Sequence, residues 1–324
     1  MRIARWVQQG VVSDGFVIDD RVVAFPDRVT VADVLAGGLA AALELGASAC
    51  AVEGIPLADV SLLAPLVPAS IRDFVAFEEH VEGVTAAIDG VSEVVPEWHE
   101  YPTFYFTNPH TVLATEDVVS PPVTERLDFE LEVGAVIGGV PGRDGANLTA
   151  ADAAEHIFGY LVFNDWSARD VQGREMKVRL GPCKGKDFGT TLGPWIVTAD
   201  EFASLHDDEG FLPLTMDVSV NGGRVGIDLL SNMGWPFAEL VAYASRNSRV
   251  VPGDVLGSGT AGNGGCLAEL WGRRGELSPP PLATGDEVVM RVEGIGEIRN
   301  VVGPAVAVPA IPPARIRPRL RERP

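Results

Sequence analysis

Three carboxylates alternate with apolar residues in the segment 127–138, LDFELEVGAVIG. Successive side chains of a strand point to opposite faces, so Asp128, Glu130 and Glu132 would lie together on one face. Like charges roughly 7 Å apart on one strand repel each other unless water or a cation lies between them. The segment therefore allows two interpretations, a solvated strand face or a binding site for a hard cation.

A second candidate is the segment 160–172, YLVFNDWSARDVQ. An apolar strand is predicted to end at Asp165, and the polar residues after it open a turn into a short helix, with Ser167 as a possible N-cap. A carboxylate at the end of a strand suits a metal ligand. The alternative is that Asp165 and Asp170 only cap the turn and pair with Arg169.

The segment 71–82, IRDFVAFEEHVE, contains a histidine among carboxylates and apolar residues. Its spacing predicts a helix that places Asp73, Phe77 and His80 near one face. His80 is then either a surface histidine or a general base, and the spacing does not decide between them.

Two glycine-rich segments complete the candidates. The first, 181–195, surrounds Lys186 with residues that let the backbone approach a ligand closely. It lacks the GxxxxGK[ST] order, so it is not a P-loop. The second, 257–270, leads into an apolar run that contains Glu269, and by itself it indicates no particular chemistry.

The elements that must position these residues are mostly short strands. Residues 1–69 combine short β-like runs with one helical pattern at 31–48, and a proline-containing connector follows them. From residue 70 to residue 324 β-like runs dominate, with helical patterns only at 149–159 and 237–246. We therefore predict an α+β, β-rich protein in which a small N-terminal α+β domain, 1–69, precedes a sandwich-like or barrel-like domain, 70–324.

Composition excludes several classes of partner. The chain of 324 residues has 45 acidic and 25 basic residues and a net charge of −20, which repels nucleic acid and anionic membranes. Only the tail 315–324 is basic, and we expect a solvated terminus or a strap onto a partner subunit.

The sequence has neither a signal-like segment nor a long apolar run, so we expect a cytoplasmic protein that does not span a membrane. Cys50, Cys183 and Cys266 form no CxxC pattern, which argues against a zinc site or a disulfide framework.

Together, the candidate segments resemble the fumarylacetoacetate hydrolase family. The resemblance rests on the order Asp73…His80, ELE at 130–132, NDWSARDVQ, GKDFGTTLGPW, and GSGT followed by Glu269, and it runs from about residue 68 to residue 302. It implies a mixed β-sandwich or β-roll around a divalent cation, preceded by a small domain as in the larger members. It also implies a homodimer.

The resemblance further implies a role for each candidate residue. The metal ligands would be Asp73, Glu130, Glu132 and Asp165. An all-carboxylate shell suits Mg²⁺ first, or Ca²⁺ or Mn²⁺, and disfavours zinc. The residues that would order the loop or bind a second ion are Lys186, Gly189 and Thr190. The residues that would contact the substrate are Tyr105, Arg169, Gln172 and Thr260.

By the same resemblance, His80 and Glu269 would activate water, and Lys186 would help to stabilise the enolate that carbon–carbon cleavage leaves. The implied substrate is a small anionic oxo acid of the 1,3-dicarbonyl or acylpyruvate type. The same metal site could instead serve an isomerase, hydratase or decarboxylase of unsaturated 2-oxo diacids in aromatic catabolism. A non-catalytic binder of oxo acids or metal is the third alternative.

The chain departs from the family pattern at the distal part of the pocket. Val75 and Met176 stand where the hydrolase has tyrosines, and the segment 81–89 has no arginine. These departures argue against fumarylacetoacetate itself as the substrate. Smaller members place the glutamate of the dyad three residues after the histidine, where this chain has Gly83, which favours Glu269 as the partner of His80.

Overall fold

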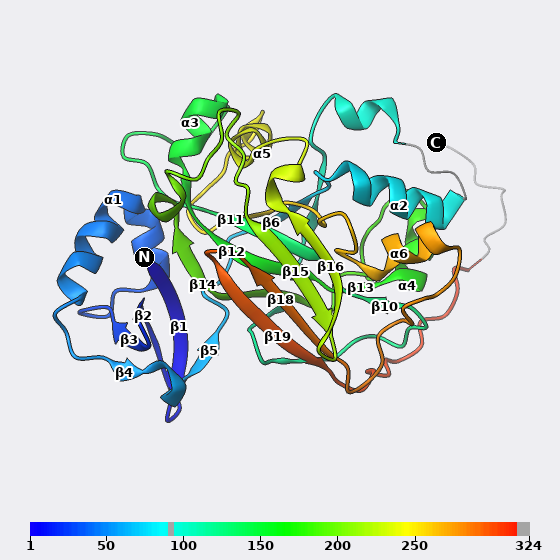
Figure 1. The fold of residues 1–324 in the computed structure, drawn as a ribbon, viewed down its shortest axis with the longest axis horizontal. Helices are drawn as coiled ribbons and strands as arrows, with labels where there is room; N and C mark the ends of the chain where they lie inside the picture. The colour runs from blue at the N-terminus through cyan, green and yellow to red at the C-terminus, as the bar shows by residue number, and fades with distance from the viewer. Residues whose placement is uncertain (90–93, 316–324) are drawn as a thin grey trace, which may run out of the picture.

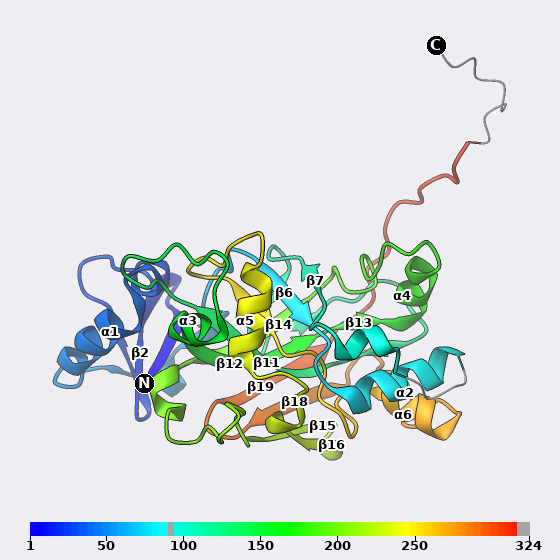
Figure 2. The ribbon, with the colours of Figure 1, turned by 90° about the horizontal axis from the view of Figure 1, so that it is seen from above.

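The computed structural model describes residues 1–89 and 94–315 and contains two large β-sheets packed face to face (Figures 1 and 2). The strands β19 and β15 of the smaller sheet contact β14, β12 and β11 of the larger one. The larger sheet has the order β4(Ile55–Pro56), β3(Arg21–Ala24), β2(Val11–Ile18), β1(Arg2–Gln8), β14(Thr190–Thr198), β12(Ile157–Asp165), β11(Leu131–Ile137), β17(Val255–Gly257), β6(Ile71–Phe74) and β7(Phe104–Thr107), with β5(Ser61–Leu63) beside β1 and β8(Val112–Leu113) beside β14.

The smaller sheet and a two-stranded ribbon complete the strands. The smaller sheet has the order β16(Gly223–Leu229), β15(Thr215–Val220), β18(Glu287–Val292), β19(Gly296–Val302) and β9(Val118–Val119), and the ribbon pairs β10(Leu127–Asp128) with β13(Ser167–Ala168). Every residue of β12 is buried because this strand lies between β11 and β14 within the larger sheet and beneath the smaller one. The prediction of a β-rich, sandwich-like α+β fold is confirmed.

The described helices lie around the sheets. They are α1(Val31–Ala49), α2(Glu78–Asp89), α3(Ala150–Glu155), α4(Arg169–Met176), α5(Phe237–Ser245) and α6(Leu267–Arg274), with short 3₁₀ turns η1(Leu57–Asp59), η2(Pro96–His99), η3(Ala199–Phe202) and η4(Leu230–Asn232). The helices α2, α4 and α6 gather at the end of the molecule that is remote from α1 (Figure 2).

The N-terminal module shares both its sheet and its core with the rest of the chain. β1 pairs antiparallel with β14, placing Ile3 opposite Ile196. One cluster of buried side chains includes Ile3 and Phe16 from the module together with Phe158 and Ile196 from the larger part. The predicted boundary at residue 69 therefore lies within a continuous sheet, and the independence of the two domains stays a prediction.

The helix α1 begins with a capping box and is bent by a close contact. The Thr30 side chain accepts a hydrogen bond from the backbone N–H of Asp33, and the Asp33 carboxylate accepts one from that of Thr30. Gly38 has a φ of 82°, and a Cβ there would lie 2.2 Å from the carbonyl oxygen of Gly139, so only glycine fits.

Among the described helices, α1 alone has the length and apolar composition of a membrane span. Its buried residues recur at intervals of three or four: Val31, Val34, Leu35, Gly38, Ala42, Gly46 and Ala49. That periodicity is typical of a helix that packs one face against a core.

Two local predictions from the sequence are wrong. The segment from Ile71 to Phe74 is strand β6, held between β17 and β7, so Asp73 lies on a strand and the helix begins only at Glu78. Ser167 is not an N-cap, because it lies in β13 and its hydroxyl donates to the carbonyl oxygen of Asp165. In both places pairing with a distant strand overrides the local pattern.

We expect Ile3→Ala to destabilise the whole chain by about 2–5 kcal/mol, because it opens a cavity in a core that both parts share. Calorimetry should show one unfolding transition moving to lower temperature. Two separate transitions, only one of which shifts, would contradict the shared core. Ile311→Ala, at a side chain that is 91% exposed, is the matched control.

Candidate metal centre and active site

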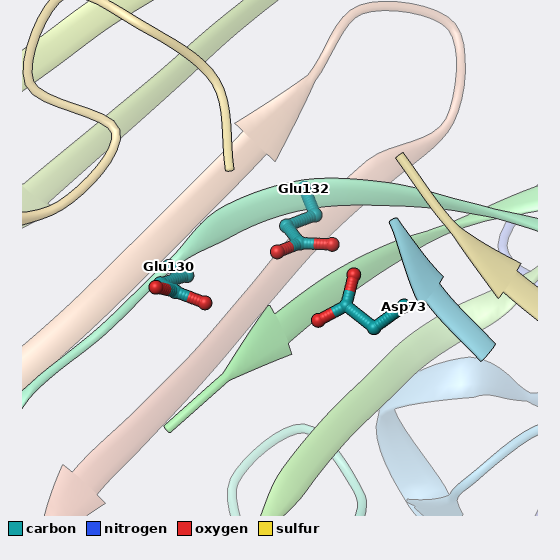
Figure 3. A group of neighbouring side chains, drawn as sticks. All are labelled: Asp73, Glu130 and Glu132. Carbon is teal, nitrogen blue, oxygen red and sulfur yellow. The ribbon is translucent and has the colours of Figure 1, made fainter. Parts of the chain in front are cut away.

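Three carboxylates converge in the interior, and they come from two segments of the larger sheet (Figure 3). Asp73 is on β6, Glu132 is on β11, and Glu130 lies in the break between β10 and β11. Their exposed fractions are only 2%, 0% and 3%, and one oxygen of each lies within 4.8 Å of the others. Burial rules out the solvated strand face as an explanation of the ELE segment.

The strand β17 sets the space between these carboxylates. Gly257 of β17 pairs with Asp73 on one side and with Gly134 on the other. A Cβ at Gly257 would lie 2.7 Å from Asp73 Oδ1 and 2.9 Å from Glu132 Oε2. The glycine thus leaves open the volume in which the carboxylate oxygens meet.

Two buried cations pair with the neighbouring acids. The Lys186 ammonium donates to Asp165 Oδ2 at 2.5 Å and also to Glu130. Arg169 Nη1 lies 2.7 Å from Glu130 Oε1, and its Nε donates to Asp128 Oδ2 at 2.8 Å. Arg169 therefore pairs with Glu130 and Asp128, and not with Asp165 and Asp170 as the turn-capping alternative predicted.

The acids respond differently to this environment. Burial and the charge of Asp165 raise the pKa of Asp73 well above its usual range, and burial and Asp73 do the same for the pKa of Glu132. Burial also opposes ionisation of Glu130, but Lys186 and Arg169 outweigh it and lower its pKa. Glu130 thus already has cationic partners, whereas the positive charge near Asp73 and Glu132 is too small to offset their burial.

The residues fit a hard divalent cation. Among the described residues, Asp73 Oδ1 and Asp165 Oδ1 are buried and have no hydrogen-bond partner. Carboxylate oxygens are the donors that Mg²⁺, Ca²⁺ and Mn²⁺ prefer. A cation beside Asp73 and Glu132 would supply the missing positive charge and displace their protons. Asp165 lies outside the tight group of three, and Tyr105 and Lys186 both donate to its other oxygen.

His80 is buried against α6 rather than exposed. Its side chain is on α2 and is 7% exposed, and its Nδ1 lies 3.6 Å from Cys266 Sγ. Burial, together with the charges of Arg169 and Lys186, outweighs the attraction of Glu130 and lowers the pKa of His80 to about 4. The ring is therefore neutral at physiological pH and can accept a proton.

Glu269 lies on α6, which packs against the helix α2 that carries His80, but its side chain has other partners. Its Oε2 accepts from the backbone N–H of Gly264 at 3.2 Å, and Arg273 Nη2 lies 2.8 Å from Oε1. Burial outweighs Arg273 and raises the pKa of Glu269 to about 7. A Cβ at Gly83 would lie 2.4 Å from Glu269 Cγ, so Gly83 makes room for this side chain. The expected pairing of His80 with Glu269 stays a prediction, since Cys266 makes the described contact.

A cavity of about 380 Å³ brings most of the candidates together. The predicted residues that line it are Asp73, His80, Tyr105, Glu130, Glu132, Arg169, Gln172, Lys186 and Thr260. Asp165, Gly189, Thr190 and Glu269 are not part of the lining. Thr190 is the strand partner of Asp165 between β14 and β12, and Gly189 lies beside Leu113. Both residues are therefore next to the site without lining the cavity.

Two further residues hold the site and were not assigned from the sequence. Asp128 accepts from the backbone N–H groups of Leu267 at 2.8 Å and Ala268 at 3.0 Å, so it caps α6 while it pairs with Arg169. The position of Asp128 two residues before Glu130 was the sequence feature that could have identified it. Cys266 is the N-cap of α6, and no sequence pattern marked its contact with His80.

The fold and site define an α+β enzyme whose cavity combines a buried carboxylate cluster with buried cations and a neutral histidine. Residues 69–303 match the family model described as fumarylacetoacetate (FAA) hydrolase C-terminal. The chain therefore belongs to the fumarylacetoacetate hydrolase family, as its motifs predicted.

Relatives and solved structures agree with this assignment. The fumarylacetoacetase of Arabidopsis thaliana is 32% identical over 68% of this chain, which spans 63% of that protein's length. A maleylpyruvate hydrolase from Sphingobium, solved with manganese(II) and pyruvate, has a TM-score of 0.68 at 22% identity, covering 94% of this chain and all (100%) of that one. A 5-carboxymethyl-2-hydroxymuconate delta-isomerase from Mycobacterium smegmatis has a TM-score of 0.66 at 24% identity, covering 95% and 100%. At these identities the two structures show the shared fold.

We expect Glu130→Gln combined with Glu132→Gln to weaken Mg²⁺ or Mn²⁺ binding at least about tenfold, because charged oxygens become neutral amides. Isothermal calorimetry measures the affinity. Glu125→Gln, at an exposed position just before β10, is the matched control. Unchanged affinity in the double variant would contradict the ELE carboxylates as ligands.

The raised pKa of Glu269 makes a pH-dependent prediction. Its pKa is about 7 in the folded chain against an ordinary value of 4.5, so ionisation opposes folding by up to about 3 kcal/mol above pH 7 and by nothing below about pH 4. Glu269→Gln should therefore raise the free energy of unfolding at pH 8 and have little effect near pH 4. Urea denaturation measures both.

Glu276→Gln, at an exposed residue just beyond α6, is the control for the general effect of removing a carboxylate. A Glu269→Gln variant that is less stable than the wild type at pH 8 would show that the pairing with Arg273 outweighs burial.

Proposed function

We propose that the protein is a divalent-metal-dependent hydrolase that cleaves a carbon–carbon bond in a small acylpyruvate-type oxo acid. The observation that carries this proposal is one cavity in which a neutral, buried His80 lies with Asp73, Glu130 and Glu132. The carboxylate cluster would bind a cation, and the histidine would accept a proton from water. The related maleylpyruvate hydrolase, solved with manganese(II) and pyruvate, supports the same chemistry.

Different residues of the cavity would serve different steps of the reaction. When bound by Asp73, Glu130 and Glu132, with Asp165 as the expected fourth ligand, the cation supplies polarisation of the substrate's carbonyl oxygens. His80 accepts a proton from water, and the hydroxide adds to the acyl carbonyl carbon. The bond between that carbon and the pyruvate methylene breaks, and the acyl part leaves as a carboxylic acid. The electron pair goes to the pyruvate enolate, which takes up the proton held by His80 to give pyruvate.

Charged side chains stabilise that enolate and orient the keto acid. Burial opposes the charge of Lys186, but Asp165 and Glu130 raise its pKa, so it remains an ammonium ion throughout. Arg169 donates to Gln172 Oε1 at 3.2 Å, which fixes both side chains at the cavity wall. Tyr105 and Thr260 are the other expected substrate contacts. Glu269 would orient His80 after a change of side-chain conformation.

An isomerase, hydratase or decarboxylase of unsaturated 2-oxo diacids is the alternative. The fold shared with a 5-carboxymethyl-2-hydroxymuconate delta-isomerase supports it, because an enolate stabilised by the same charged side chains would serve both kinds of reaction. The alternatives differ in what His80 would deprotonate, which is water in hydrolysis and a substrate carbon in isomerisation.

Several accompanying properties belong to the same proposal. Mg²⁺ is the expected ion, and the second-ion role of Lys186, Gly189 and Thr190 is a further expectation. The protein is expected to be a cytoplasmic homodimer that binds neither nucleic acid nor membranes. Its net charge of −20 repels anions, so Lys186, Arg169 and the cation must attract the anionic substrate locally.

We expect turnover of oxo acids in ¹⁸O-water to place ¹⁸O in a released carboxylate, because hydrolysis adds one water oxygen to the acyl carbon. Mass spectrometry of the products measures it. Turnover that never labels a released carboxylate would refute hydrolysis and favour the isomerase alternative.

In the same assay, His80→Ala should lower kcat by about 10²–10⁴-fold, which is the usual contribution of a positioned general base. Metal affinity should be unchanged, since His80 is not among the carboxylate ligands. Wild-type turnover in His80→Ala would remove the histidine from the mechanism.

A further inference from the structure

The residues that line the cavity fall into two chemical groups. The carboxylates, Lys186 and Arg169 form the charged group, called here the ion-binding end, and the apolar residues form the apolar end. The rest of the wall is mainly apolar and comprises Phe74, Val75, Val84, Phe104, Met176 and Pro182. Val84 lies one helical turn beyond His80 on α2, so this apolar wall begins directly after the proposed base.

Within the part of the chain that the structure describes, the apolar end has no cation to receive a second carboxylate. Among the described residues that line the cavity, the only cations are Lys186 and Arg169, and both are already bound to Glu130. The sequence from residue 81 to residue 105 contains neither lysine nor arginine. Lys177 and Arg179, which follow α4, are exposed and are not part of the lining.

Hydrogen bonds to backbone groups hold parts of the apolar wall in place. The carbonyl oxygen of Val75 accepts from Trp98 Nε1 at 2.7 Å. The Glu175 carboxylate accepts from the backbone N–H groups of Cys183, Lys184 and Gly185 at 2.7–3.1 Å, which fixes the loop that carries Pro182. The wall is therefore a preformed surface, and a preformed apolar surface selects by burial of apolar area.

Resting on the proposed function, we propose that the acyl group of the substrate ends in an uncharged, apolar chain and not in a second carboxylate. The keto-acid half lies at the ion-binding end, and the chain lies against Val75, Val84 and Met176. A terminal carboxylate there would lose part of its water without gaining a cationic partner, whereas each buried methylene favours binding by up to about fourfold.

Three acids test this specificity: acetylpyruvate, pentanoylpyruvate and glutarylpyruvate, which has the chain length of pentanoylpyruvate with a terminal carboxylate. With the full chain loaded with Mg²⁺, kcat/KM should be highest for pentanoylpyruvate and at least about tenfold lower for glutarylpyruvate. Equal or faster cleavage of glutarylpyruvate would overturn the inference and leave the hydrolase function standing.

Failure to cleave any of the three acids would instead refute the proposed function for this substrate class. Calorimetric binding of the same acids to the Mg²⁺-loaded protein then still tests the chain preference. Tighter binding of glutarylpyruvate than of pentanoylpyruvate would overturn the inference in that case also.

Met176→Arg puts a cation on the apolar wall from the last residue of α4, where the side chain is 47% exposed. The ratio of kcat/KM for glutarylpyruvate to that for pentanoylpyruvate should rise at least about tenfold, mainly through KM. Val178→Arg adds the same charge at a position that is 71% exposed and outside the lining, and it should leave the ratio unchanged. A similar change in both variants would mean that general charge, and not the cavity wall, sets the preference.

Discussion

The structure depends on negative charge buried with too little positive charge to balance it. Each carboxylate taken out of water costs several kcal/mol unless it gains partners. Lys186 and Arg169 provide those partners for Glu130, Asp165 and Asp128. Burial nevertheless raises the pKa values of Asp73, Glu132 and Asp165. The imbalance is a reason for the cluster to bind a divalent cation, because the cation supplies the charge that the chain lacks.

The surrounding elements keep this costly arrangement open. Gly257 on β17 leaves the space between the carboxylates, since any larger residue would put a carbon atom in it. Asp128 joins the cluster to α6, because one carboxylate binds Arg169 and the first N–H groups of that helix. Cys266, at the N-cap of α6, then contacts His80. The position of the histidine thus depends on the same ionic network as the cation site.

On the proposed function and specificity, the chemistry and the substrate preference come from different parts of one cavity. The ion-binding end combines residues whose motifs are shared with the family. The opposite end is apolar, and its residues Val75 and Met176 interrupt the family pattern. On that proposal, the site would cleave a carbon–carbon bond and accept an acyl group with an apolar end.

Much of the fold and of the site was accessible from the sequence. Alternation in β-like runs indicated the β-rich fold, and the spacing of ELE indicated neighbouring carboxylates. The helix predicted over Asp73 and the cap predicted at Ser167 were wrong, because both segments pair with strands that are distant in the sequence. No local pattern contains that information, since hydrogen bonds between distant strands decide it.

The sequence by itself determined which residue types are present and, through the motifs that they form, membership of the fumarylacetoacetate hydrolase family. Only the tertiary structure decided which of those charges are buried and which partners they have. It brought β6 to the far side of β17 from β11, buried His80 against Cys266 and directed Glu269 toward Arg273. The reason is that pKa values and ion pairs depend on distance and burial, which the order of residues does not specify.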